Sequence, residues 1–315
     1  MDDKFRYSDT NKRYHPQNYY LRKKFGKKVI KVSLNGGFTC PNKDGTRGRG
    51  GCTYCSELES GDFGGNPCKS VREQFDDVRS VLSEKWPDAL YIPYFQAGTN
   101  TYAPTERLRE LFEEALSIEN TVGLAVSTRP DCISDETADY LAELSMRTYL
   151  TVELGLQTVH DITAEKINRC HTYADFLNGY QKLHSRGINV CVHIINGLPG
   201  EDREMMLETV RRISQLDLHS IKIHLLHIIR GTAIAAQLEA GEFEPMSYDD
   251  YINIVCDQLE LLSPETVVQR ITGDGDRKTL IAPLWSLDKK RVMNGIDKEL
   301  LRRNSFQGIK FNAVR

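Results

Sequence analysis

Seven short apolar runs, rich in β-branched or aromatic residues, recur along the chain and constrain its fold more than any other feature. They lie at residues 29–34, 89–95, 122–127, 148–154, 188–195 and 220–226, with a seventh, weaker run at 267–271. Runs of this length, bounded by turn residues, are typical of buried strands. The sequence therefore predicts up to seven strands spread over most of its length.

Between most of these runs, apolar residues recur at spacings of three and four, which places them on one face of a helix. These sets are Val71, Phe75, Val78 and Leu82; Ala138, Leu141 and Leu144; Phe176, Tyr180 and Leu183; Met206, Val210 and Ile213; and Ile252, Val255, Leu259 and Leu262. Because a parallel strand pair needs a crossover, the alternation predicts parallel βα units. Six or seven units are too few for an eight-unit barrel, so we expect an α/β fold with an open, partial (β/α)6 barrel.

The organisation of the chain is expected to be simple. No linker rich in Pro, Gly or Ser divides the series of runs, and 40% apolar residues in a chain of 315 can build one large core. We expect a basic aromatic N-terminal extension at 1–28, the barrel at 29–272 and a C-terminal extension at 273–315.

A cysteine-containing loop follows the first expected strand. Cys40, Cys52 and Cys55 form a C-x11-C-x2-C array, and the glycines between them favour a tight loop over a helix or strand. Three thiolates leave one position open on a metal site. The residues alone allow a catalytic zinc, a structural zinc completed by a distant ligand, a disulfide with a spare thiol, or a 4Fe-4S cluster with one free iron.

This array, with Tyr54 as the aromatic residue before the last cysteine, resembles that of the radical S-adenosylmethionine (radical SAM) enzymes. The long first spacing is similar to the Elp3-like branch and its bacterial YtqA/YhcC type, over residues 15 to 285. The resemblance implies a partial (β/α)6 radical SAM barrel, a 4Fe-4S cluster on Cys40, Cys52 and Cys55, and SAM on the fourth iron. It also implies reductive cleavage of SAM to methionine and a 5'-deoxyadenosyl radical that abstracts hydrogen.

Polar residues and glycines follow successive expected strands, where parallel βα folds gather their ligands. From their match to the family's SAM-binding segments, we expect SAM to be held by Gln96, Thr99, Asn100, Arg129, Glu153, Gln157 and Gly197. Arg129 could take a carboxylate in bidentate fashion, and Glu153 or Gln157 could bind ribose hydroxyls or the SAM amine. The alternative is that such residues merely cap the helices that follow.

Basic residues gather at both ends of a chain whose net charge is −3. Residues 1–31 carry +7 and residues 289–315 carry +6, whereas the stretch between them carries −16. Aromatic and histidine side chains alternate with the charges of the N-terminal segment, among them Tyr7, Tyr14, His15, Tyr19, Tyr20 and Phe25. Such a surface can neutralise phosphates and stack on bases; the alternative is a solvated arm whose aromatics pack on the barrel.

The resemblance implies that the polyanion is tRNA and that the reaction matures its wobble uridine, from a 5-carboxymethylaminomethyl to a 5-aminomethyl side chain. It also implies an electron donor such as flavodoxin or ferredoxin. No apolar run approaches the ~18 residues that span a bilayer, so we expect a cytoplasmic protein without membrane contact.

Two other functions stay open: a radical SAM enzyme acting on a small metabolite or porphyrin, and a non-catalytic, zinc-stabilised RNA-binding module. The sequence assigns no catalytic residue. It also leaves open the roles of Cys68, Cys170, His224 and His227.

Overall fold

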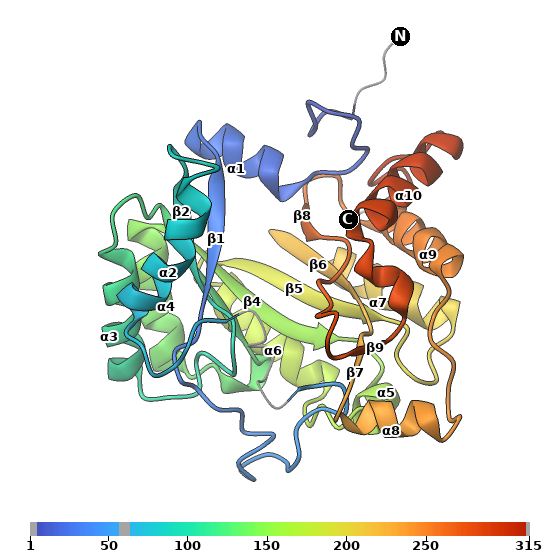
Figure 1. The fold of residues 1–315 in the computed structure, drawn as a ribbon, viewed down its shortest axis with the longest axis horizontal. Coiled ribbons are helices and arrows are strands. Elements are labelled where there is room, and N and C mark those ends of the chain that lie inside the picture. Colours follow the sequence, from blue (N-terminus) through green and yellow to red (C-terminus); the bar gives the residue numbers. More distant parts are fainter. Residues whose placement is uncertain (1–4, 57–63, 313–315) are drawn as a thin grey trace.

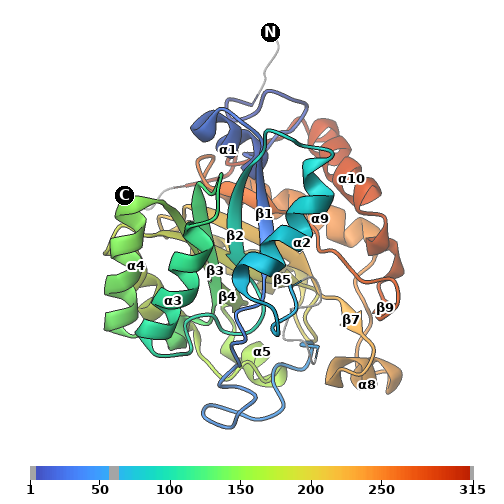
Figure 2. The same cartoon turned by 60° about the vertical axis from the view of Figure 1, so that its left-hand side comes forward.

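A computed structural model describes residues 5–56 and 64–312 and shows one curled, parallel sheet (Figures 1 and 2). The strand order is β1-β2-β3-β4-β5-β6-β8. The bounds are β1 Val29–Leu34, β2 Leu90–Phe95, β3 Gly123–Thr128, β4 Tyr149–Gln157, β5 Asn189–Asn196, β6 Ser220–Leu225 and β8 Val267–Arg270. Each of the seven apolar runs overlaps one of these strands, and β3, β4 and β5 continue one to three residues beyond their runs. The expected α/β partial barrel is confirmed, with β1 and β8 at the two edges of the curled sheet.

Helices cover the outer face of the sheet (Figure 1). They are α2 Val71–Ser83, α3 Thr105–Leu116, α4 Asp135–Arg147, α6 Tyr173–His184, α7 Arg203–Ser214 and α9 Tyr248–Leu261. In α4, Ser134 caps the first turn by accepting from the Thr137 N–H, and the expected apolar face is fully buried. The sequence analysis did not include α3, although Leu108 and Phe112 show the same spacing and are fully buried.

The N-terminal segment closes the base of the barrel beside β8. Helix α1 (Gln17–Phe25) contacts β8 and β1, and the Val268 N–H donates to the His15 carbonyl at 2.8 Å. Figures 1 and 2 show α1 at the start of β1, at the end of the barrel opposite to the loop that follows that strand.

The aromatic side chains of this segment face inward. Tyr14 and His15 are buried, and the Tyr7 ring stacks on His15 with centroids 4.4 Å apart. Tyr20 packs edge-on against His219 of the barrel. The expectation that these aromatics stack on bases is therefore wrong for most of them, because their faces are already covered. The lysines and arginines of the N-terminal segment remain mostly exposed.

Smaller elements surround the carboxyl ends of the strands. They are η1 Pro130–Cys132, α5 Asp161–Lys166, β7 Ile228–Ile229, α8 Ala233–Glu239, β9 Leu280–Ala282, η2 Leu284–Leu287 and α10 Lys289–Arg302. Strands β7 and β9 pair antiparallel, which returns the chain after β8 to the end of β6. Within the described ranges, none of the helices combines the length and the apolar character that a bilayer crossing needs.

Candidate active site at the carboxyl ends of the strands

A cavity of about 300 Å³ opens at the carboxyl ends of the strands, beside the loop that joins β1 to α2. Its wall brings together Cys40, Cys52 and Cys55, none of which forms a disulfide. Residues from β2 to β6 and from β8 complete the wall. This is the ligand face that a parallel βα architecture predicts.

The cavity has two ends with different chemistry. We call one end the rim, formed by Cys40, Cys52, Cys55, Arg129 and Arg169. We call the other end the floor, formed by His193, Lys222, His224, His227 and Arg270.

The cysteine loop is fixed by backbone contacts to two distant segments. The Thr53 N–H donates to the Ile167 carbonyl at 3.0 Å, and the Ile234 N–H donates to the Thr53 carbonyl at 2.9 Å. The Asn168 side-chain amide donates to the Gly51 carbonyl at 2.7 Å. These contacts hold the cysteine loop, which has no helix or strand of its own, against the end of α5 and the start of α8.

Polar groups around Cys52 act on the charge of its thiol. Burial raises the pKa of Cys52, whereas a hydrogen bond with Tyr54 and the charge of Arg129 oppose that rise. The Asn42 amide donates to Cys52 Sγ at 3.7 Å. Hydrogen-bond donors and a cation near a thiol favour the thiolate, which is the form that binds metals.

The three thiols are not gathered as closely as three ligands of a single zinc ion would be. Three thiolates on one zinc would place their sulfurs about 3.8 Å apart, given Zn–S bonds of ~2.3 Å. In residues 5–56 and 64–312, one set of three possible metal ligands has its ligand atoms within 4.8 Å of one another. This set is Glu153, Cys191 and His193, and it does not include the three cysteines of the loop. The three cysteine sulfurs are therefore more widely spaced. Wider spacing fits an iron-sulfur cluster, because each thiolate binds a different iron.

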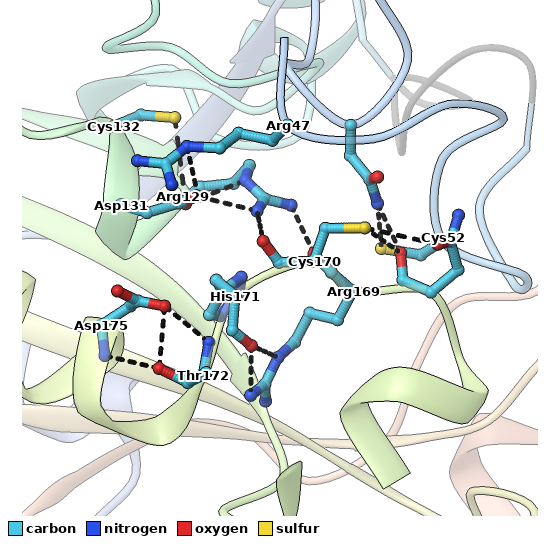
Figure 3. A network of polar contacts seen from close by, with 12 residues as sticks. Arg47, Cys52, Arg129, Asp131, Cys132, Arg169, Cys170, His171, Thr172 and Asp175 are labelled. Atoms are coloured by element: carbon cyan, nitrogen blue, oxygen red, sulfur yellow. Dashed lines mark hydrogen bonds and ion pairs between the residues drawn. The ribbon is translucent and has the colours of Figure 1, made fainter. Parts of the chain in front are cut away.

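Arg169 is the main structural residue of the rim and was missed by the sequence analysis. Its side chain is 1% exposed and donates to the carbonyls of Leu156, Thr158 and His171, the Thr158 contact being 2.6 Å. Figure 3 shows its contact with His171 in the segment before α6, and the other two carbonyls tie it to the end of β4. A lone arginine between two short helical patterns gives no sequence signal for such burial.

Arg129 has partners other than the one expected for it. Its guanidinium makes two 2.9 Å hydrogen bonds to the Asp131 carboxylate and donates to the Arg169 carbonyl at 2.8 Å (Figure 3). Burial lowers its pKa, but the Asp131 contact and the cysteine thiolates together raise it. A bidentate contact with a SAM carboxylate stays a prediction, and it would require the Asp131 contact to break.

Four of the seven residues expected to bind SAM line the cavity: Gln96, Thr99, Arg129 and Gln157. Asn100 is fully buried and donates to the Phe95 and Ser127 carbonyls at 3.1 and 2.8 Å, which ties the ends of β2 and β3 together. Gly197 lies in the wall of a second cavity beside α7 and α9. Glu153 lies below the cavity, inside the barrel.

Gln157 occupies a strained position in the wall. Its φ is +63°, a conformation that costs most L-residues about 1–2 kcal/mol, and the β4–β5 register shifts between Gly155 and Gln157. A Cβ on Gly155 would lie 2.7 Å from Gln157 Nε2. The small residue and the irregular strand end together turn the Gln157 side chain into the cavity.

The barrel interior below the floor holds a buried charge cluster that the sequence analysis also missed. The Glu153 carboxylate contacts Lys31 Nζ at 2.6 Å, Lys222 Nζ at 2.5 Å and His193 Nε2 at 2.9 Å. Burial raises the pKa of Glu153, but the two lysines outweigh it and hold the pKa well below its usual range. The available signal was that each residue interrupts an apolar strand at a position facing the lumen.

The remaining singled-out residues separate into two groups. His224 and His227 line the floor, and burial lowers the pKa of His227 to about 4, so its imidazole is neutral. Cys170 packs under the cysteine loop: a Cβ on Gly48 would lie 2.7 Å from its sulfur. Cys68 is exposed. Neither Cys170 nor Cys68 belongs to the described cavity wall.

The chain belongs to the radical SAM superfamily. The family model for that superfamily matches residues 43–213, and the radical SAM C-terminal domain matches residues 218–302. Membership implies a 4Fe-4S cluster and SAM, and the three cysteine side chains at the rim fit such a cluster.

The relatives agree with the expected branch. The chain is 54% identical to the uncharacterized protein YtqA of Bacillus subtilis, over 100% of this chain and 98% of that protein. It is 28% identical to a tRNA uridine(34) acetyltransferase of Methanocaldococcus jannaschii, over 51% of this chain and 31% of that protein. The structure of Methanocaldococcus infernus Elp3 with an N-terminal deletion superposes with a TM-score of 0.65 at 18% identity, covering 89% of this chain and 64% of the other, and shows a common fold.

Proposed function

We propose that this chain is a radical SAM enzyme that modifies the wobble uridine of tRNA, converting a 5-carboxymethylaminomethyl side chain to 5-aminomethyl. The observation that carries the proposal is three cysteine side chains in the wall of one strand-end cavity, in a chain of the radical SAM superfamily. The tRNA part is supported by the family resemblance and by the relative named as a tRNA uridine(34) acetyltransferase.

In this proposal Cys40, Cys52 and Cys55 hold the cluster. When bound, the cluster and SAM would supply reductive cleavage of SAM and removal of a hydrogen atom from an unactivated carbon. Arg129 and Tyr54 favour the Cys52 thiolate. The anchored loop would keep the thiols apart at fixed positions. The surrounding wall would limit the access of water and of other C–H bonds to the reacting atoms.

SAM would contact Gln96, Thr99 and Gln157 directly, because these side chains face the same cavity as the thiols. The other residues expected to hold SAM stay part of the proposal, with less direct positions: Asn100, Arg129, Glu153 and Gly197. Asn100 would act by holding the ends of β2 and β3 in place.

The mouth of the cavity offers basic residues to an RNA. Arg47 and Arg49 are exposed on the cysteine loop itself. Cations at this position would neutralise phosphates beside a nucleotide that enters the cavity. The electron that reduces the cluster would come from a flavodoxin- or ferredoxin-type donor. We propose that the protein acts in the cytoplasm.

Two measurements test the proposal. Anaerobically purified protein should be brown, contain about four irons per chain as a 4Fe-4S cluster requires, and release 5'-deoxyadenosine from SAM under reductant. A colourless protein holding one zinc would contradict the enzyme assignment. Deletion of the gene, followed by mass spectrometry of tRNA nucleosides, should show accumulation of the 5-carboxymethylaminomethyl form. An unchanged wobble-uridine profile would exclude this substrate.

One observation favours the small-molecule alternative. Basic helix α1 lies at the opposite end of the barrel from the cysteine loop (Figure 2), so it would not border an RNA bound at the mouth. An enzyme acting on a small metabolite should bind its substrate with little dependence on salt, whereas RNA binding should weaken steeply as salt is raised.

A further inference from the structure

The charged residues in the cavity wall are all of one sign. The described wall contains five basic residues, Lys43, Arg129, Arg169, Lys222 and Arg270, and no aspartate or glutamate. At the rim the basic groups have protein acceptors: Lys43 donates to the Ser56 carbonyl at 3.1 Å, and Arg129 pairs with Asp131. These rim contacts account for the positions of those side chains without any ligand.

At the floor the positive charges outnumber the negative ones. Inside the barrel two cations, Lys31 and Lys222, meet a single carboxylate, that of Glu153, which they share. Arg270 is about one third exposed and reaches Asp274 at 3.4 Å, and Lys289 contacts the same carboxylate at 2.6 Å. One positive charge is therefore left over in a largely enclosed part of the barrel, where burying an unbalanced charge is costly.

Hydrogen-bonding groups at the floor also remain unused. Lys222 Nζ donates to Glu153 and to the Tyr94 hydroxyl at 3.1 Å, and its third N–H has no acceptor among residues 5–56 and 64–312. The Nε2 atoms of His224 and His227 are buried and have no hydrogen-bond partner in the same described part of the chain. Buried polar groups are normally satisfied, so such a set indicates a missing ligand.

We propose that the floor is a receptor for one monoanionic group of the substrate, which Lys222 and Arg270 would bind as cations and His224 as a neutral donor. The inference rests on the proposed function and adds to it the specificity-determining residues. A single negative charge would balance the surplus cation, and the free N–H groups would donate to its oxygens.

Two anions in a tRNA have this chemistry: a carboxylate on the modified base and a phosphodiester of the backbone. Lys222 is buried inside the barrel, whereas Arg47 and Arg49 are exposed on the cysteine loop. A base side chain reaches such a depth more readily than the backbone, so the carboxylate is the favoured source.

The test compares two anticodon stem-loop RNAs that differ only in charge. One carries 5-carboxymethylaminomethyluridine at the wobble position, and the other carries its primary amide. Their Kd values are measured by fluorescence anisotropy with reconstituted, SAM-bound enzyme in the absence of reductant, so that no turnover occurs. The variants are Arg270→Gln and Lys222→Met. Lys12→Met is the matched control, because Lys12 pairs with Asp297 outside the cavity.

We expect wild-type enzyme and the Lys12→Met control to bind the acid at least about tenfold more tightly than the amide, as for a charge-assisted hydrogen bond. Arg270→Gln and Lys222→Met should reduce that ratio to near one. A ratio near one in wild type, with both RNAs weakened equally by the variants, identifies a phosphate as the anion. Unchanged Kd values for both RNAs in both variants would overturn the receptor.

A second probe separates this inference from the tRNA assignment. If wild-type enzyme binds neither RNA, the proposed substrate is wrong, and acetate alone then tests the receptor. Acetate should raise the thermal midpoint of wild-type protein relative to chloride at equal ionic strength, and Arg270→Gln should abolish the difference. Equal midpoints in acetate and chloride for wild type would refute the anion receptor in that case.

Discussion

The rim and the floor of the cavity use basic residues in opposite ways. At the rim, Arg129 is paired with Asp131, and Arg169 is surrounded by backbone carbonyls. At the floor, Lys222 shares one glutamate with a second lysine while two histidines have unpartnered nitrogens.

This difference separates structural cations from binding cations. A buried arginine whose N–H groups all meet protein acceptors holds the chain together and has little capacity left for a ligand. A buried surplus charge whose N–H groups lack acceptors is stabilised when a ligand of opposite charge binds to it. The comparison predicts that rim variants will mainly change assembly and stability, whereas floor variants will change recognition.

The largest expected effect comes from the thiols of the rim. Cys52→Ala should remove the cluster and reduce SAM cleavage to background, because two thiolates cannot hold four irons at the proposed spacing. Iron content and visible absorbance after anaerobic reconstitution measure this directly. Cys68→Ala is the control, since Cys68 is exposed and outside the described wall. Loss of metal in the Cys68 variant would support the zinc module instead.

The second effect should be on stability. Arg169→Met leaves the carbonyls of Leu156, Thr158 and His171 without their buried donor, and breaking such a buried network costs about 3–5 kcal/mol. Denaturant unfolding of metal-free protein measures the loss. Arg107→Met, which removes an exposed helix-surface pair with Glu110, should cost less than about 1 kcal/mol. Equal losses in the two variants would contradict a structural role for Arg169.

The third prediction concerns pH and the floor. Burial lowers the pKa of Lys222 to about 8, although Glu153 opposes the shift. Above that pH the lysine loses its charge, so affinity for the carboxylate-bearing RNA should fall towards the affinity for the amide RNA. Lys222→Arg should remove the fall between pH 8 and 10. The charged and titratable groups that bear on Lys222 are Glu153, Lys31, Arg270, Cys191, His193 and Tyr94.

Stability should move the other way, which separates this effect from unfolding. The pKa of Lys222 in the unfolded chain is near its usual 10.5 and therefore exceeds the folded value. Between these two pH values the unfolded chain binds more protons, so this residue makes the folded state more stable as pH rises. A loss of affinity that tracks a loss of folded protein would show that Lys222 is not the cause.

Much of the fold could be predicted because its determinants are local. The apolar run of β4 and the spacing of Ala138, Leu141 and Leu144 in α4 can be recognised from the residue pattern of each segment alone. The three cysteines were found because their spacing is a local pattern. Even Lys31 and Lys222 carried a usable signal, since a charge inside an apolar parallel strand must either be paired or bind something.

The remaining features depend on contacts between distant segments. The burial of Arg169 requires the end of β4 and the segment before α6 to converge, and no spacing within either segment specifies that. Tyr14 and His15 have the composition of a nucleic-acid surface, yet their positions follow from the pairing of the N-terminal segment with β8. Composition predicted their chemistry, and only the topology could show which of their faces were covered.

The smallest expected effect tests whether the strained backbone at Gln157, in the cavity wall, serves SAM binding. Gln157→Gly should leave stability within about 1 kcal/mol of wild type, because relief of the φ of +63° offsets the added entropy of the unfolded glycine. The same variant should weaken SAM binding, measured by calorimetry on reconstituted protein without reductant, since the wall loses a polar side chain. Asn304→Gly, at a φ of +49° in the turn after α10, relieves similar strain away from the cavity and should leave SAM binding unchanged. If both variants bind SAM as wild type does, the conformation of Gln157 serves the end of the strand, and the Gln157 side chain is not a SAM contact.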